Sequence, residues 1–483
     1  MNCLYITQEY APYFVEGGLG VTSSALPATL QKEHGDRHDL VLPYYPWLVE
    51  RHGLGAEVVC ELPEAHIGGV RATATVLRLL GHGGPCDVYL VRADSWYARE
   101  GLYRDASYTE FGDAVERAAF FGRCVAEWVE RTGLDYDLVH GNDWQSGAAL
   151  AQLRHRDPEL PMLLSIHNAE YAGALGSTPL DGLGLPEATV RLLREEAADE
   201  PTLLLLGLLS ADAAVTCSPG YARELLAQSR GGPFGRALER LKVSGIIFGV
   251  DGDVWNPAAG GRMSIPFRPD TVEEGKRLNK QALQRHVGLT ESADVPVIGV
   301  CSRFVREKGT DLLLAALTPL LRRGLVQLVV VGPGAAEYHE AFLRLAEELP
   351  GGVVHLPRFE QETAWLVYAG SDMTLMPSRT EPCGLNQLIA LAYGTLPVVS
   401  RVGGLQDTVV DLRHDPVRGA GALIPEHTPR SVRDTVLDLM AWMRDSPSQL
   451  SVTRRRAMVQ DWSWSRTAQD YHELYVALGE PAR

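Results

Sequence analysis

A chain of 483 residues and 52.8 kDa is too long for one ordinary hydrophobic core, so its length predicts two or three domains, of which two is the simplest expectation. A hydrophobic fraction of 45% and a charged fraction of 22% are typical of a soluble globular protein. The formal net charge is −16 and the sequence contains no strong basic patch, so we expect neither nucleic acid nor an anionic membrane as a partner.

The cysteines and the apolar segments indicate a compartment. Seven cysteines without any C-x-x-C pair argue against a disulfide framework or a zinc site. The N-terminal residues have the pattern of a first strand, not of a signal peptide, and the apolar run 203–209 is too short to span a bilayer. We therefore expect a cytoplasmic protein with no metal and no cofactor, and a buried helix over 203–209.

The first half of the chain alternates short apolar runs with longer amphipathic ones, which predicts a parallel sheet covered by helices. The two strongest helices are predicted over 114–131 and 219–228, the second with Ser218 as N-cap and Pro219 in the first turn. The expected strands are 3–7, 38–42, 88–91, 138–140, 162–166 and 213–216.

Between residues 231 and 269 glycines, prolines and polar residues accumulate, and we expect the connection between the domains there. The alternation then resumes, with helices predicted over 311–322, 335–348 and 364–369. The second set of expected strands is 297–301, 326–331, 353–356, 373–376 and 396–400. The chain therefore predicts two doubly wound units, whose ligands bind beyond the C-terminal ends of the strands.

The last predicted element is an amphipathic helix with Trp462 and Trp464 as apolar anchors. It follows the final elements of the second unit and could return to brace the first one.

Several polar residues of the first unit follow predicted strands. Gly17 and Gly18, after the first strand, would let a phosphate or sugar approach the backbone, although a tight strand-to-helix turn explains them equally well. Asp143 follows strand 138–140, and His167 and Asn168 follow strand 162–166. These residues are expected at the same edge of one sheet, without the spacing of metal ligands.

In the second unit, cationic side chains follow strand 297–301. Ser302, Arg303 and Lys308 lie where a diphosphate could bind, the alternative being an exposed turn in which Lys308 pairs with Glu307. Glu381 lies where a polar loop meets the start of a helix, a place that suits an anion. Because Ser-His-Asp, G-x-S-x-G and Walker patterns are absent, the residues together favour group transfer from a nucleotide diphosphate.

The segment PSRTEPCGLNQLIALAYGTLPVV, followed by GGLQDTV, resembles the signature of bacterial glycogen synthases and plant starch synthases, retaining glycosyltransferases of family 5. EGGLG, NDWQSG, ADAAVTCSPGYARELL and SRFVREKGTDLLL occur in the family order. The resemblance implies an α/β GT-B fold, in which two Rossmann-like doubly wound domains face a central cleft. It implies an N-terminal acceptor-side domain over 1–244, joined by a C-terminal helix over 462–483, and a donor-binding domain over 245–461.

The resemblance also implies roles for single residues. Those expected to act in catalysis are Arg303, Lys308, Glu381 and His167. Those expected to bind the donor nucleotide and its phosphates are Gly17, Gly18, Ser302, Arg303, Lys308, Gly384, Leu385 and Asn386. Those expected on the sugar and acceptor side are Glu9, Asp143, Asn168 and Phe248. The main catalytic device would be electrostatic stabilisation of the departing diphosphate, without a protein nucleophile.

The chain departs from the family pattern at three places. The family motif K-T-G-G-L contains a lysine that contacts the donor phosphates, and Val15 and Glu16 stand at the matching positions here. Phe248 replaces the asparagine of N-G-I-D, and H-D-W-H reads Asn142 to Gln145. With the donor cations retained, these changes suggest an altered sugar or acceptor.

The main hypothesis is a retaining glycosyltransferase or pseudo-glycosyltransferase of secondary metabolism. It would transfer a sugar or a sugar-like cyclitol from an NDP-activated donor to a small saccharide or pseudosugar acceptor. The first alternative is an α-1,4-glucan (glycogen) synthase that uses ADP- or UDP-glucose. A sugar epimerase with the GT-B fold and a non-catalytic sugar-nucleotide-binding protein are the alternatives from other classes.

Overall fold

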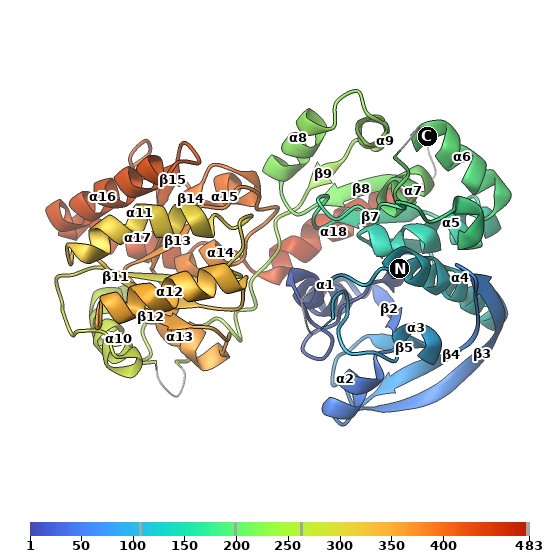
Figure 1. The fold of residues 1–483 in the computed structure, drawn as a ribbon, viewed down its shortest axis with the longest axis horizontal. Helices are drawn as coiled ribbons and strands as arrows, with labels where there is room; N and C mark the ends of the chain where they lie inside the picture. The colour runs from blue at the N-terminus through green and yellow to red at the C-terminus, as the bar shows by residue number, and fades with distance from the viewer. Residues whose placement is uncertain (106–108, 198–199, 261–263, 480–483) are drawn as a thin grey trace. The chain divides into compact units, whose positions relative to one another are not determined.

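The computed structural model of the protein describes residues 1–105, 109–197, 200–260 and 264–479. The chain divides into two compact units (Figure 1). Unit 1 consists of Met1–Ile246 and Trp464–Arg483, and unit 2 consists of Ile247–Ser463. Residues 480–483, at the end of the C-terminal helix expected over 462–483, lie outside the described residues.

Unit 1 is built on a nine-stranded sheet in the order β3-β4-β5-β2-β1-β6-β7-β8-β9. Its strands are β1 (Asn2–Ile6), β2 (Arg37–Pro43), β3 (Gly55–Ile67), β4 (Val70–Leu80), β5 (Asp87–Arg92), β6 (Leu138–Asn142), β7 (Met162–Ile166), β8 (Ala213–Thr216) and β9 (Ser244–Gly245). The six expected strands are all present, and two of them have the predicted bounds. From β5 to β9 neighbouring strands are parallel, as the alternating pattern predicts.

The antiparallel part of this sheet is not among the expected strands. β3 and β4 form a long hairpin at one edge of the sheet, and β4 pairs antiparallel with β5 (Figure 1). Most residues of β3 are exposed, including the first five in succession, so both faces of this part of the edge strand meet water and its sequence shows no regular apolar alternation.

The helices of unit 1 that precede unit 2 in the chain lie between these strands. They are α1 (Gly18–His34), α2 (Pro46–Arg51), α3 (Asp94–Tyr97), α4 (Ala114–Thr132), α5 (Gly147–Arg156), α6 (Glu187–Ala197), α7 (Leu203–Ser210), α8 (Pro219–Gln228) and α9 (Pro233–Leu241), with short 3-10 turns over Trp144–Ser146 and Leu180–Leu183. The Ser218 hydroxyl accepts the Tyr221 N–H at the start of α8, which confirms the predicted cap. α7 is the buried helix expected over 203–209, whereas α9 lies inside the stretch expected to be an irregular connection.

Unit 2 contains a six-stranded sheet, entirely parallel, in the order β12-β11-β10-β13-β14-β15. Its strands are β10 (Val297–Cys301), β11 (Gln327–Val331), β12 (Val353–Leu356), β13 (Met373–Met376), β14 (Leu396–Ser400) and β15 (Ala422–Ile424). Its helices are α10 (Val272–Val287), α11 (Thr310–Arg322), α12 (Ala336–Glu348), α13 (Gln361–Gly370), α14 (Asn386–Ala392), α15 (Gly403–Thr408), α16 (Pro429–Asp445) and α17 (Pro447–Met458), with a 3-10 turn over Pro269–Thr271.

The core of unit 2 lies on both faces of the sheet. Ile298 and Val300 of β10 belong to a cluster that includes residues of α11 and α16, whereas Val297 and Cys301 belong to a cluster with residues of α13. Successive residues of one strand thus enter opposite cores, which explains why the strands of this unit read as continuous apolar runs.

The last helix, α18 (Trp464–Gly479), belongs to unit 1 and packs against α1. Trp464 is buried there, whereas Trp462 packs against a cluster of Leu391, Ala420 and Ala457 in unit 2. The expectation that both tryptophans anchor one helix is therefore wrong for Trp462, because the boundary between the units falls between the two. Among the described residues, no helix combines the length and the apolar character needed to cross a membrane.

Candidate functional site

In unit 2 the predicted donor-site cations follow β10. Ser302 and Arg303 come directly after the strand, and Lys308 lies at the end of the following turn, just before α11. Arg303 is half-buried, and within the described ranges its guanidinium has no ion-pair partner. A half-buried arginine in that condition can bind a phosphate without first breaking an ion pair.

Lys308 and Glu381, which are far apart in the sequence, form an ion pair. The Lys308 Nζ lies 2.9 and 3.0 Å from the two carboxylate oxygens of Glu381, and both side chains are largely buried. The Ser378 hydroxyl donates to Glu381 Oε2 at 3.0 Å. Lys308 also lies 3.7 Å from Glu307, so the alternative pairing considered from sequence is present as well, at a longer distance.

The turn that carries Lys308 is pinned to the loop that carries Glu381. The Arg379 guanidinium contacts both carboxylate oxygens of Asp311 at 2.7 and 2.8 Å and donates to the Arg306 carbonyl at 2.7 Å. Gly309 has a φ of 70°, and a Cβ at this position would lie 2.0 Å from the Pro377 carbonyl oxygen. Glycine is therefore required for the turn to approach the loop closely.

The predicted backbone amides of Gly384, Leu385 and Asn386 precede or begin α14. The Asn386 side-chain amide donates to the Cys301 carbonyl, which ties α14 to the end of β10. Gln387, which is fully buried, donates from Nε2 to the Cys383 carbonyl at 3.1 Å and to the Gly384 carbonyl at 2.6 Å. These contacts fix the carbonyls of the loop.

Phe248 also belongs to unit 2, although the other three residues predicted for the sugar and acceptor side belong to unit 1. Its side chain is buried, and its backbone hydrogen-bonds the Cys383 side chain next to the donor loop. Burial is the larger effect on that thiol, and it raises the pKa of Cys383 to about 12.

In unit 1 the glycine-rich loop is organised by Glu9. Its Oε2 accepts the backbone N–H groups of Glu16 and Gly17 at 2.9 Å and of Gly20 at 3.2 Å. Its Oε1 accepts the Tyr103 hydroxyl at 2.9 Å. The Gly17 N–H, predicted to face a donor phosphate, is thus donated to a carboxylate of the protein itself, while Gly18 begins α1.

Asp143, His167 and Asn168 come together at the ends of β6 and β7. Asp143 Oδ1 accepts the backbone N–H of His167 at 2.7 Å and that of Asn168 at 3.5 Å. Asp143 has a φ of 53°, an unusual value for a residue with a Cβ. The Asn168 side chain accepts the Glu170 N–H at 3.0 Å.

Burial shifts the titration of this group. It raises the pKa of Asp143 to about 7, although the two backbone N–H groups act in the opposite direction. It lowers the pKa of His167 to about 4. The histidine ring is therefore neutral at physiological pH, and Asp143 changes charge near neutrality.

Sequence reasoning missed the residues that hold the predicted ones in place. Tyr103 reaches Glu9 from a distant loop, and no sequence pattern connects the two. Ser378, Arg379 and Gln387, in contrast, lie inside the segment PSRTEPCGLNQ. Their place inside the segment that carries the family resemblance was the available signal.

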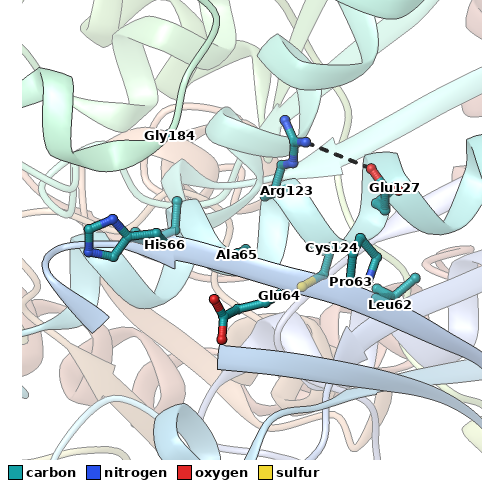
Figure 2. A pocket seen from close by; sticks show the side chains of 10 residues that line it. Leu62, Pro63, Glu64, Ala65, His66, Arg123, Cys124, Glu127 and Gly184 are labelled. Atoms are coloured by element: carbon teal, nitrogen blue, oxygen red, sulfur yellow. Dashed lines mark ion pairs between the residues drawn. The ribbon is translucent and has the colours of Figure 1, made fainter. Parts of the chain in front are cut away.

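One cavity of about 210 Å³ lies elsewhere in unit 1 (Figure 2). Residues of β3 and α4 line it. Figure 2 shows Arg123 paired with Glu127 at its wall, and the two side chains lie 3.8 Å apart. None of the predicted site residues lines this cavity. We therefore place the candidate site at the strand ends of each unit and not in this cavity.

Comparison with known families agrees with the two units. Residues 2–241 match the family described as the starch synthase catalytic domain, and residues 295–441 match glycosyl transferases group 1. The catalytic domain of starch synthase IV from Arabidopsis thaliana, solved with ADP and acarbose bound, superposes with a TM-score of 0.86 at 25% identity, over 99% of both chains.

Bacterial relatives cover the whole length. The glycogen synthase of Anaeromyxobacter dehalogenans strain 2CP-1 is 37% identical over 99% of each chain. That of Syntrophotalea carbinolica is 35% identical over 98% of each chain. The GT-B fold and the resemblance to glycogen and starch synthases are confirmed, and the chain belongs to the glycogen synthase family of retaining glycosyltransferases.

Proposed function

We propose that the protein is an α-1,4-glucan synthase, which transfers a glucosyl group from a nucleotide-activated glucose to the end of a glucan chain. The observation that carries this proposal is the similarity, along the whole chain, to proteins named glycogen synthase. Their names support this function over the small-acceptor transferase that the sequence first favoured.

Unit 2 would bind the donor. Arg303 and Lys308 would contact the diphosphate and stabilise the negative charge that develops on it as the bond to the sugar breaks. Glu381, held by Lys308 and Ser378, would accept hydrogen bonds from hydroxyl groups of the donor sugar. No protein nucleophile and no metal enter this step.

Unit 1 would supply the residues of the sugar and acceptor side. Asp143 holds the backbone of His167 and Asn168, whose polar groups would bind sugar hydroxyls. The GT-B resemblance implies that the His167 carbonyl lies near the anomeric carbon. Since glucan chains are neutral, hydrogen-bonding groups and not cations are the suitable partners on this side.

The first experiment compares donors and acceptors. ADP-, UDP- and GDP-glucose are each incubated with the protein and with glycogen or maltooligosaccharides, and nucleotide release and chain extension are measured. Extension of the glucan supports the proposal. Nucleotide release only with small saccharides, epimerisation without transfer, or binding without turnover would each contradict it.

A second candidate function is favoured by Val15. This residue is 42% exposed at the position where the family motif has a phosphate-binding lysine. Losing that cation would favour a different donor, such as a sugar-like cyclitol, with a small saccharide or pseudosugar as acceptor. The same assay, extended to a panel of small acceptors, distinguishes this function from glucan synthesis.

A pair of substitutions tests the donor site. We expect Arg303→Ala and Lys308→Ala each to lower kcat/KM by about 100-fold or more, because each removes a cation that contacts the leaving diphosphate. Steady-state nucleotide release measures the effect. Arg306→Ala is the matched control, since Arg306 lies in the same turn with an exposed side chain. Near-normal rates in the first two variants would refute the donor-site assignment.

A further inference from the structure

Asn142 makes three hydrogen bonds at the end of β6. It is 1% exposed, and its side-chain amide lies between the neighbouring strand β1 and the residue that follows β7. Nδ2 lies 3.0 Å from the Ile6 carbonyl oxygen, and Oδ1 lies 3.1 Å from the Tyr5 hydroxyl and 2.9 Å from His167 Nε2.

The Ile6 carbonyl fixes which way this amide points. A carbonyl oxygen can only accept, so the Asn142 NH₂ must face it. A flipped amide would bring two oxygens together in a buried place, leaving both without a donor. The Asn142 oxygen therefore faces Tyr5 and His167, and it can only accept from them.

It follows that His167 must donate from Nε2. An imidazole that carries its proton on Nε2 and is neutral has a lone pair on Nδ1, which then accepts. The burial that lowers the pKa of His167 agrees with a neutral ring. The Asp143 carboxylate holds the backbone of the same residue, so the ring and the backbone are each fixed by a neighbour on β6 or at its end.

We propose that Asn142 is a positioning residue, which fixes His167 as the neutral tautomer with the proton on Nε2, the form in which Nδ1 can act only as an acceptor. The effect of this tautomer on transfer rests on the proposed function, while the tautomer itself does not. The family motif has histidine at this position, and a histidine ring could itself donate or accept. The asparagine of this chain removes that freedom.

The first experiment reads the tautomer directly. The full-length protein is labelled with ¹⁵N-histidine, and long-range proton–nitrogen spectra are recorded from pH 5.5 to 8, with His167→Gln identifying the signals. We expect the neutral form with the proton on Nε2 throughout this range. A proton on Nδ1, or titration to the imidazolium near pH 6.5, would overturn the proposal whether or not the protein is active.

The second experiment changes the acceptor into an anion. In Asn142→Asp a carboxylate would lie against Nε2 and favour the imidazolium, so we expect the pKa of His167 to rise by about 1–3 units. The acid limb of the pH profile of kcat/KM for transfer should then move to higher pH. A merely structural role predicts a uniform loss at every pH, and an unchanged limb would refute the proposal.

Other ionisable groups also face His167, and they are the same in the parent protein and in Asn142→Asp. A difference between the two in the pKa of His167 therefore reports on position 142. These groups are Glu9, His140, Asp143 and Cys217.

Two further variants complete the test. Tyr5→Phe removes the other donor to the same oxygen and should leave the His167 spectrum and the pH profile unchanged. If Asn142→Asp does not fold, Asn142→Ala removes the acceptor without adding charge. In that variant the two neutral tautomers should coexist, and a spectrum identical to the parent would refute the proposal. Absence of turnover with every donor would contradict the proposed function alone, because the tautomer is read without substrate.

Discussion

At the scale of single residues, unit 1 uses carboxylates to bind its own backbone amides. Glu9 accepts two N–H groups of the loop before α1 and a third in the first turn of α1, and Asp143 accepts two after β7. Burial is the main cause of a raised pKa in both. A phosphate directed at the Gly17 N–H would therefore have to displace Glu9. This occupied position fits a chain in which Val15 replaces the cation that the family places nearby.

The raised pKa of Asp143 predicts a pH dependence of stability. An acid whose pKa is higher in the folded protein stabilises the fold below its unfolded pKa of 3.8, and this contribution is lost as the pH rises through about 7. Asp143→Asn does not ionise and keeps an oxygen for the two N–H groups. As the pH rises from 5 to 8.5, the free energy of unfolding of the variant should increase by on the order of 2 kcal/mol relative to that of the parent protein.

Urea unfolding at both pH values measures this difference. Asp135→Asn is the control, since Asp135 is exposed and removal of its charge should change stability equally at both pH values. If the free energy of unfolding of Asp143→Asn shows no gain relative to the parent protein between pH 5 and pH 8.5, the buried carboxylate does not titrate in this range.

At the scale of elements, the donor loop of unit 2 is shaped by close contact with α15. The Gly404 N–H donates to the Glu381 carbonyl at 3.0 Å. A Cβ on Gly403 would lie 2.1 Å from that carbonyl oxygen, and a Cβ on Gly404 would lie 2.2 Å from the Cys383 carbonyl oxygen. Gln387 bonds to the Thr408 hydroxyl at the other end of α15. The short helix thus acts as the support of the segment that carries Glu381.

Gly404→Ala tests this support. The added methyl group would collide with backbone, so the loop must shift, at a cost of about 1–3 kcal/mol in the free energy of unfolding. We also expect weaker binding of the nucleotide-sugar donor, measured by titration calorimetry. Gly252→Ala is the control, because a Cβ there meets no atom within 4 Å. Unchanged donor affinity in Gly404→Ala would show that α15 does not position the loop.

At the scale of the whole molecule, unit 1 is completed by the end of the chain. The Tyr475 hydroxyl of α18 lies 2.7 Å from Nδ1 of His140. The other ring nitrogen of His140, Nε2, lies 2.7 Å from the Ser165 hydroxyl. His472 pairs with Asp36 at 2.7 Å. A helix distant in sequence therefore satisfies buried polar groups of β6 and β7, the strands that end at Asn142 and Ile166.

Tyr475→Ala should destabilise unit 1 selectively. Loss of a fully buried aromatic ring costs about 3–5 kcal/mol, and the His140 ring would lose a hydrogen bond. Differential scanning calorimetry should show the transition of one unit at lower temperature and that of the other unchanged. Val476→Ala changes the adjacent exposed residue and should leave both transitions in place. Equal shifts of the two transitions after Tyr475→Ala would contradict an effect confined to unit 1.

Much of the fold could be read from the sequence, and the misses have physical reasons. β7, β8 and β10 have the predicted bounds because a strand covered on both faces is a continuous apolar run between polar ends. The hairpin β3–β4 was missed because an edge strand that is exposed along most of its length carries a weaker pattern. Trp462 was assigned to the wrong neighbour, since an aromatic residue near a domain boundary can pack against either unit.

The sequence by itself determined the family, the two-unit α/β fold and the residue types of the candidate site, because periodicity and motif spacing are properties of the chain alone. Only the tertiary structure decided which of those residues meet. Lys308 and Glu381 lie 73 positions apart and Asn142 and His167 lie 25 apart. Parallel strands place such residues together at one edge of a sheet. Direct contacts in the folded chain then decide that the Gly17 N–H is bound by Glu9 and that His167 donates from Nε2.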